Sequence, residues 1–112
     1  MNSCEPWKLY KKILPQHTDH AGVVWHGTYL NWLEESRIDS LGKAGIQYIE
    51  LLNRGFEMPV YKIEIRYLIP IMIGEQIIIK SFFFTNKGPR IKVNSTFTNL
   101  SNKIHAEAIV DL

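Results

Sequence analysis

The apolar residues of the chain recur with two different periods, and these periods divide it into two kinds of element. Alternation of apolar and polar residues is typical of half-buried strands, whereas recurrence every three or four residues is typical of an amphipathic helix. Strands are predicted at Trp7–Leu14, Val60–Tyr67, Arg90–Asn99 and Lys103–Leu112, and a more apolar strand is predicted at Glu75–Thr85. The helical period predicts one long helix, Gly27–Ala44, and a shorter one, Gln47–Arg54.

The long helical segment has a broad apolar side and clear stop signals. Its apolar face is predicted to consist of Tyr29, Leu30, Trp32, Leu33, Ile38 and Leu41. The charged residues that fall mainly on its other faces are Glu34, Glu35, Arg37 and Asp39. Lys43 in the last turn and Gly45 just beyond it are typical of a helix C-terminus. One strand, one long helix and then strands with short connections favour an α+β domain whose antiparallel sheet packs on the helix.

The composition is that of an ordinary globular domain. The 112 residues are 46% hydrophobic and 21% charged, and the net charge is +2. This balance excludes intrinsic disorder, and it gives too weak a field for a protein that coats nucleic acid. The length fits a single domain over residues 1–112. The final predicted strand runs to the last residue, so we expect the chain to be cut within or just after it.

Cysteine usage and apolar runs limit the cellular setting. Cys4 is the only cysteine, which excludes an intrachain disulfide and a four-cysteine zinc site. The longest apolar run, Leu68–Ile73, contains Pro70 and is far shorter than the roughly 18 residues of a membrane helix. The N-terminus lacks the apolar core of a signal peptide. We therefore expect a cytoplasmic protein that does not insert into a membrane.

Residues that could perform chemistry gather in one loop before the long helix. The phosphate-binding P-loop, the Rossmann glycine motif, the nucleophile elbow and the zinc-protease helix motif are all absent. The loop and the residues just after it contain His17, Asp19, His20 and His26. Imidazole and carboxylate groups suit zinc or iron, so a metal site is one interpretation of this cluster. The other interpretation is that these polar residues only keep a surface loop solvated.

Three blocks of the sequence resemble one enzyme family. The first and most specific is Thr18–Arg37, TDHAGVVWHGTYLNWLEESR. The second is Tyr67–Pro70 followed by Gly74 and Glu75, and the third is Asn86–Arg90. Over essentially the whole chain, these blocks resemble the 4-hydroxybenzoyl-CoA thioesterase family of hotdog-fold enzymes. The resemblance implies a long central helix packed on an antiparallel sheet of five or six strands, and family members usually carry further residues at the C-terminus.

The resemblance also assigns roles to residues. It implies that Asp19 is the catalytic carboxylate, as nucleophile or general base, and that the backbone N–H of His26 polarises the thioester carbonyl while its side chain adds a hydrogen bond. Thioester hydrolysis needs such a carboxylate and a donor for the oxyanion, and a helix N-terminus has unpaired N–H groups. The implied positions that bind substrate or CoA are Gly22, Val23, Tyr29, Met58, Pro59, Val60, Lys87 and Arg90. No metal or cofactor is implied, because coenzyme A is part of the substrate.

Each of these residues also has an ordinary structural interpretation. His26 can simply cap the helix, and Lys87 and Arg90, with Lys92 nearby, can form a charged turn. More typical of a solvated helix face than of catalysis are Glu34, Glu35 and Arg37. More typical of a core or an interface than of a ligand site are Trp25, Trp32 and Phe56.

The resemblance predicts an acyl-CoA thioesterase that releases a free acid and CoA from an aromatic or short-chain acyl-CoA. Candidate substrates are 1,4-dihydroxy-2-naphthoyl-CoA and 4-hydroxybenzoyl-CoA, and bulky Tyr29, Trp32 and Leu33 argue against a long acyl tunnel. The alternatives are a hotdog acyl-thioester dehydratase, whose usual histidine motif is missing, and a non-catalytic acyl-CoA-binding module, which has no need of Asp19. The family also implies a homodimer or homotetramer with active sites between subunits.

Overall fold

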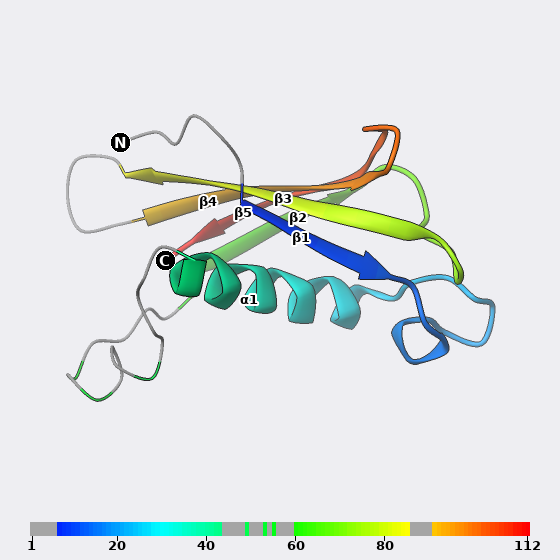
Figure 1. The fold of residues 1–112 in the computed structure, drawn as a ribbon, viewed down its shortest axis with the longest axis horizontal. Helices are drawn as coiled ribbons and strands as arrows, with labels where there is room; N and C mark the ends of the chain where they lie inside the picture. The colour runs from blue at the N-terminus through cyan, green and yellow to red at the C-terminus, as the bar shows by residue number, and fades with distance from the viewer. Residues whose placement is uncertain (1–6, 44–48, 50–52, 54, 56–59, 86–90) are drawn as a thin grey trace.

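One helix packs on one face of a five-stranded antiparallel sheet (Figure 1). The computed structural model describes residues 7–43, 49, 53, 55, 60–85 and 91–112. The strands are β1 (Trp7–Lys12), β2 (Lys62–Tyr67), β3 (Gln76–Thr85), β4 (Ile91–Asn99) and β5 (Ile104–Asp111), and the helix is α1 (His26–Lys43). A short 3₁₀ helix, Pro15–His17, follows β1. The order of strands in the sheet is β1-β3-β4-β5-β2, so β1 and β2 are its edges.

The predicted strands and long helix are confirmed, with small differences at their ends. The first strand ends at Lys12 and the second begins at Lys62, because residues that alternate in sequence need not pair with a neighbour. The predicted α+β class and the antiparallel sheet on a long helix are confirmed, with five strands in the described part of the chain. The shorter helix predicted at Gln47–Arg54 falls mostly outside the described residues.

The core lies between α1 and the inner face of the sheet. Alternate residues of the central strands point inward, and the register places Phe97 opposite both Ile79 and Ala106. The side chains of these three residues have no measurable exposure. Tyr29 and Trp32 of α1 pack over Phe97, with ring centroids 5.1 and 6.4 Å from it. The N-terminal half of the helix is therefore held to the sheet by aromatic contacts.

The inward-facing side of α1 differs from the prediction. Leu30 and Ile38, assigned to the apolar face, are exposed, whereas Arg37 is 6% exposed and buried. The side chains that face the sheet here are Ser36, Arg37 and Ser40, which continue the stripe of Tyr29, Trp32 and Leu33 at helical spacing. The stripe was missed because these residues are polar. Their burial corrects the interpretation of Arg37 as part of a solvated face.

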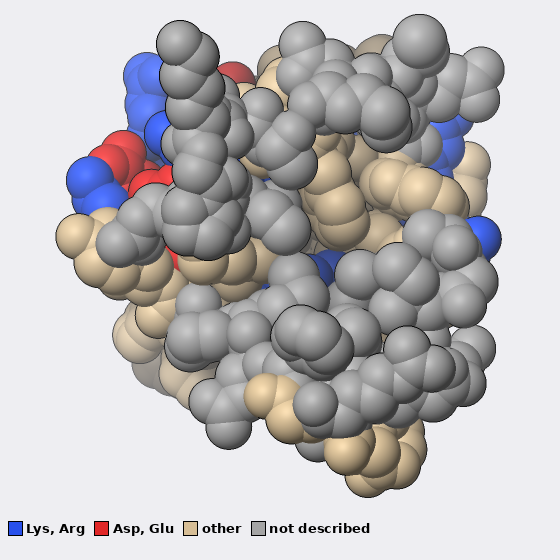
Figure 2. Space-filling view, turned by 90° about the vertical axis from the view of Figure 1, so that its left-hand side faces the viewer, with Lys and Arg blue, Asp and Glu red and all other residues tan. Residues whose placement is uncertain are grey.

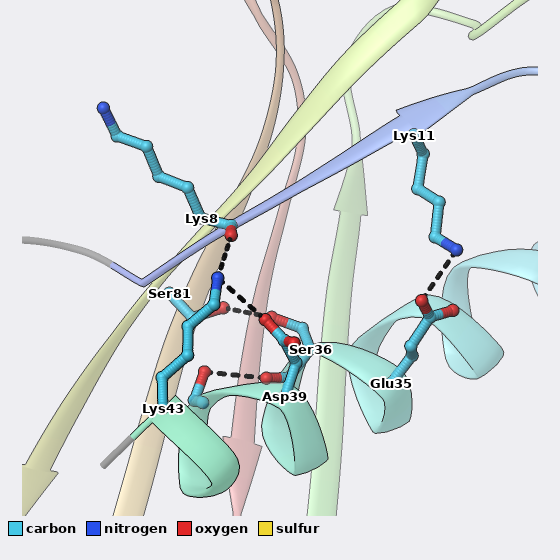
Figure 3. A network of polar contacts seen from close by, with 8 residues as sticks. Lys8, Lys11, Glu35, Ser36, Asp39, Lys43 and Ser81 are labelled. Carbon is cyan, nitrogen blue, oxygen red and sulfur yellow. Dashed lines mark hydrogen bonds and ion pairs between the residues drawn. The ribbon is translucent and has the colours of Figure 1, made fainter.

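Buried hydroxyl groups link α1 to the middle of the sheet. The Oγ atoms of Ser36 and Ser81 lie 3.0 Å apart, and those of Ser81 and Ser95 lie 2.8 Å apart. Ser40 donates to the backbone oxygen of Ser36 over 2.7 Å. Figure 3 shows this connection between the helix and β3. Because serine is small and its hydroxyl is paired, the helix can approach the sheet here without leaving these hydroxyls unsatisfied.

Charged side chains fasten α1 to the edge strand β1. Lys11 lies 2.7 Å from Glu35, and Lys43 donates to the backbone oxygen of Lys8 while it pairs with Asp39 (Figure 3). Glu35 is thus engaged in the contact between helix and sheet. Figure 2 shows positive and negative groups side by side at one edge of the molecule. Within the described ranges, no helix is long and apolar enough to span a membrane.

Candidate active site

The turn that begins at Asp19 is shaped by its own carboxylate. Asp19 Oδ1 accepts hydrogen bonds from the backbone N–H groups of Ala21, over 2.9 Å, and of Val23, over 3.1 Å. The backbone N–H of Asp19 donates to the oxygen of Val23, which closes the turn. Short acidic side chains commonly nucleate such turns. The second carboxylate oxygen accepts no hydrogen bond from the described residues, and the side chain is exposed, so one oxygen holds the turn and the other remains available for chemistry.

The far side of this turn is locked to the connection between β2 and β3. Gly22 has a φ of +77°, a conformation that side chains rarely adopt, and an added Cβ would lie 3.3 Å from Ile73. Its backbone oxygen accepts from the N–H of Ile73, and Val24 donates to the oxygen of Ile71. Glycine is required here both by the backbone and by the close approach of the second segment. These bonds bring the first and second sequence blocks together.

His17 has a structural role. Its Nδ1 accepts from the backbone N–H of Leu14 over 3.0 Å, and its ring meets Trp32 edge-on. Its backbone oxygen accepts from the Thr28 hydroxyl, which ties the loop to α1. An Nδ1 that accepts a hydrogen bond must be unprotonated. Burial lowers the pKa of His17, and the nearby charge of Lys11 lowers it further.

This shifted pKa predicts a loss of stability in acid. The unfolded chain takes up a proton on His17 near pH 6.5, whereas the folded chain resists it, so stability falls as the pH drops through this value. His17→Asn keeps an acceptor for Leu14 but does not titrate. Urea unfolding at pH 7.5 and pH 5 should show a smaller acid loss in this variant than in the wild type. His20→Asn, at an exposed site in the turn, is the control and should behave like the wild type.

The N-terminus of α1 lies beside this turn. The backbone N–H groups of His26 and Gly27 donate to no backbone oxygen of the described residues, as expected for the first turn of a helix. Trp25, just before the helix, lies across Gly27, because a Cβ there would come within 2.3 Å of the indole. The side chain of His26 is exposed and meets the Trp25 ring edge-on. The first turn of α1 therefore offers two backbone donors that have no backbone acceptor, together with the partial positive charge of a helix N-terminus.

A pocket of about 470 Å³ opens next to these donors. Its lining residues come from the loop, the first turns of α1 and the end of β2, namely Val23, Val24, His26, Tyr29, Tyr67, Leu68, Ile69 and Pro70. Most of these side chains are apolar, with a few polar groups among them, which is typical of a site for a small organic ligand. Asp19 does not line the pocket itself but pairs with Val23, which does.

His105 supports the pocket, and sequence analysis gave it no role. Its backbone oxygen accepts from the N–H groups of both Leu68 and Ile69 over 2.9 Å, and its buried ring lies 3.3 Å from the oxygen of Pro70. A carbonyl only accepts, so Nδ1 carries the proton in this contact. The register of β4 and β5 shifts next to this point, between Phe97 and Thr98. No local pattern in the sequence announces such a shift.

The structure brings together some of the predicted site residues. Gly22, Val23, His26 and Tyr29 lie at or beside the pocket, with Asp19 one turn away. Val60 lies elsewhere, in a separate small pocket between α1 and β2 that Arg37 also lines. The predicted positions Met58, Pro59, Lys87 and Arg90, and also Phe56, lie outside the described residues. Trp32 is a core residue as predicted, whereas Trp25 is largely exposed.

The alternative of a metal site finds no grouping to support it in the part of the chain that the structure describes. No three His, Cys, Asp or Glu side chains there are close enough to hold a metal ion. His17 uses its Nδ1 within the fold, and Asp19 uses one oxygen in its turn. The local arrangement instead offers a carboxylate, two unpaired backbone donors and a mainly apolar pocket.

Comparison with known proteins places this arrangement in a family. Residues 13–112, nearly the whole chain, match the family described as the thioesterase-like superfamily. The chain belongs to this superfamily. Among individual relatives, the Synechocystis protein sll0410, provisionally named an esterase, is 40% identical over 77 residues, which are 68% of this chain and 46% of the relative. Bacillus subtilis YneP, provisionally named an acyl-CoA thioesterase, is 32% identical over 65 residues, 58% of this chain and 47% of its own. The chain thus spans about half the length of these relatives.

Several solved structures share the fold of this chain. The 1,4-dihydroxy-2-naphthoyl-CoA thioesterase of Synechocystis superposes with a TM-score of 0.87 at 18% identity, over 95% of this chain and 79% of the other. The DHNA-CoA thioesterase of Staphylococcus aureus gives 0.86 at 22% identity, over 95% and 71%. The S. aureus protein SAV2348, solved in complex with CoA, gives 0.86 at 12% identity, over 96% and 68%. The hotdog fold expected from the sequence is therefore confirmed.

Proposed function

We propose that this protein hydrolyses the thioester of an aromatic acyl-CoA, with Asp19 and the N-terminus of α1 as the reacting site. The observation that carries the proposal is the pocket of about 470 Å³, which is lined by His26, the first residue of α1, and by Val23, which pairs with Asp19 in the turn. The superfamily and the thioesterase names of its relatives support the reaction type. The naphthoyl-CoA thioesterases among the structural neighbours support an aromatic acyl group.

The chemistry follows from the charges that develop during hydrolysis. Water adds across the C–S bond, so an oxygen bonds to the carbonyl carbon and CoA leaves as the thiol. The carbonyl oxygen gains negative charge on the way, and the N–H groups of His26 and Gly27 can stabilise it. Asp19 either attacks the carbonyl carbon or removes a proton from the attacking water, and both routes need its ionised carboxylate.

A release assay for free thiol tests the proposal. We expect turnover of benzoyl-CoA and 1,4-dihydroxy-2-naphthoyl-CoA with higher kcat/KM than that of butyryl-CoA, and poor turnover of palmitoyl-CoA. The buried rings of Tyr29 and Trp32 leave little room for a long chain along the helix. A clear preference for palmitoyl-CoA would contradict the aromatic assignment. Tight binding of acyl-CoA without release of thiol would identify a binding module instead.

We further propose that a second copy of the chain completes the site along the edge strand β2. In the described part of the chain, β2 pairs with β5 alone, and the apolar side chains of Ile63 and Tyr67 are 37% and 54% exposed. Unpaired backbone groups and exposed apolar residues on one edge favour pairing with another strand. Tyr67 also lines the pocket, so a partner along β2 would border it.

The same pairing bears on the predicted CoA contact at Lys87 and Arg90. The described residues that flank this segment, Thr85 and Ile91, lie at the end of the sheet opposite the N-terminus of α1 (Figure 1). The ten residues of β3 span about 33 Å between these ends. If β2 pairs antiparallel with β2 of a second copy, the sheets of the two copies run in opposite directions. The end of the second sheet where β3 ends and β4 begins then lies towards the pocket of the first chain. We propose that the CoA phosphates meet the cations of the second chain.

Replacement of both Lys87 and Arg90 by alanine is therefore expected to raise KM for acyl-CoA more than it lowers kcat. These residues would bind a part of the substrate that does not react. Such a contact stabilises the bound substrate and the transition state equally, so its loss raises KM and leaves kcat largely unchanged. The increase should shrink with an acyl-pantetheine substrate that lacks the nucleotide phosphates. Steady-state kinetics with both substrates checks this expectation. An equal loss on both would show that the segment matters for folding and not for phosphate binding.

A further inference from the structure

The hydroxyl of Tyr29 is a buried polar group without a protein partner. The residue is 3% exposed, and its hydroxyl makes no hydrogen bond with any residue of the described chain. The hydroxyl oxygen nevertheless keeps some contact with solvent. It does not belong to the described side-chain atoms that have neither solvent contact nor a hydrogen-bond partner. The only described pocket that Tyr29 lines is the one at the N-terminus of α1. Its remaining accessible surface, which includes the hydroxyl, therefore faces this pocket.

The ring that carries this hydroxyl is held on several sides. Phe97 and Tyr67 meet it edge-on with centroids 5.1 and 5.0 Å away, and Trp32 does so at 6.1 Å. A side chain packed in this way has one position, so a ligand that bonds to it loses little additional freedom. The hydroxyl is thus placed before a ligand arrives.

The same surroundings keep the hydroxyl protonated. Burial raises the pKa of Tyr29 to about 12, and the nearby Tyr67 and Glu75 act in the same direction. At neutral pH the group is a neutral phenol that can donate a hydrogen bond and can also accept one. A ligand that fills the pocket excludes water from this hydroxyl, and a buried hydroxyl without a partner is costly, so a ligand that supplies a partner gains more than one that cannot.

The position of Tyr29 relative to His26 relates the hydroxyl to the acyl part of a substrate. Tyr29 follows His26 by three residues, so both lie on the same side of α1, a little less than one turn and about 4.5 Å apart along the axis. A thioester carbonyl bound at the His26 N–H would direct its acyl group along this side of the helix. The walls around it are the apolar side chains of Val24, Leu68 and Pro70.

We propose that the Tyr29 hydroxyl is a specificity-determining group that hydrogen-bonds an oxygen substituent on an aromatic acyl group. The pocket then favours a hydroxylated ring over the unsubstituted one. This inference rests on the proposed thioesterase function, since it places the acyl group in the same pocket. A single neutral hydrogen bond of ordinary net strength corresponds to about two- to tenfold in selectivity, and we expect the effect in the upper half of this range because the site is buried.

The test compares wild type and Tyr29→Phe, which keeps the ring contacts and removes only the hydroxyl. The measured quantity is kcat/KM for the 2-, 3- and 4-hydroxybenzoyl-CoA esters, each divided by that for benzoyl-CoA. We expect the largest of these ratios to fall about fivefold or more in the variant. Tyr10→Phe, at a 62% exposed position on β1 outside the pocket, is the matched control and should keep the wild-type ratios. Ratios in Tyr29→Phe within twofold of the wild type would overturn the proposal.

A binding measurement separates this inference from the proposed function. Non-hydrolysable thioether analogues of the same hydroxylated and unsubstituted acyl-CoAs are titrated calorimetrically into the wild type and Tyr29→Phe. If no acyl-CoA is hydrolysed, the thioesterase proposal fails, yet the ratio of Kd values still tests the role of Tyr29. A ratio that falls in the variant supports the role, and an unchanged ratio rejects it. A thermal melt of each variant confirms that folded proteins are compared.

Discussion

Asp19→Asn is expected to lower the kcat of thioester hydrolysis by about 10²–10⁴-fold, the usual contribution of one positioned acid or base. The substitution suits this site because it separates the role of the Asp19 carboxylate in the turn from its proposed role in the reaction. Its Oδ1 accepts two backbone hydrogen bonds that hold the turn, and an asparagine oxygen can do the same. What asparagine lacks is the negative charge that, in the proposed reaction, attacks the carbonyl or activates water. The loss should therefore appear in kcat without a loss of stability.

The control for this variant is Asp39→Asn. Asp39 pairs with Lys43 at the other end of α1, and its removal costs a partly exposed ion pair without touching the pocket. Steady-state kinetics and thermal melts of both variants distinguish catalysis from folding. If Asp19→Asn keeps more than about a tenth of the wild-type turnover, another group is the base. If its melting temperature drops sharply, the turn depends on more than the acceptor at Oδ1.

The parts of the fold that the sequence predicted are those with a strong period. In β4 the alternation is regular and β3 is a strongly apolar run, and both strands lie within one residue of the prediction because their inner residues fill one core. The helix was found for the same reason, from Tyr29 and Trp32 at helical spacing. Period-based inference works where burial is achieved by apolar side chains.

Inference from the hydrophobic period failed where the buried side chains are polar. Ser36, Ser40 and Arg37 continue the inner stripe of α1, but a hydropathy pattern counts each of them as solvent-facing. The Ser36 hydroxyl is paired with Ser81, which in turn pairs with Ser95, and both partners are distant from Ser36 in sequence. Partners separated by tens of residues leave no local trace in the sequence.

The candidate site also has one part that the sequence could predict and another part that it could not. The turn at Asp19 and Gly22 could be predicted, because a short acidic residue followed by glycine encodes a tight turn locally. The contribution of His105 could not, because it reaches the loop after β2 only through the register shift between β4 and β5. The free state of the Tyr29 hydroxyl could not be foreseen either, since it depends on what the fold leaves around that oxygen.

The edge strand β2 carries the second large expected effect. We expect Ile63→Asp to weaken self-association by about 100-fold or more and to lower activity at low protein concentration. In an antiparallel pairing along β2, each copy would bury its own new carboxylate, and a buried unpaired polar group costs about 1–3 kcal/mol or more. Activity falls with it because the proposed site includes the second chain. Light scattering and kinetics over a dilution series measure the two effects.

Two comparisons test the expectation for Ile63→Asp. Tyr10→Asp places the same charge on the opposite edge strand β1, and it should leave the oligomer intact, since β1 is fastened to α1 through Lys11 and Glu35. The wild type itself should lose activity per chain on dilution below its dissociation constant, which needs no variant that must fold. A wild type that is monomeric at micromolar concentration and fully active would rule out a shared site, because then one chain alone binds and turns over the substrate.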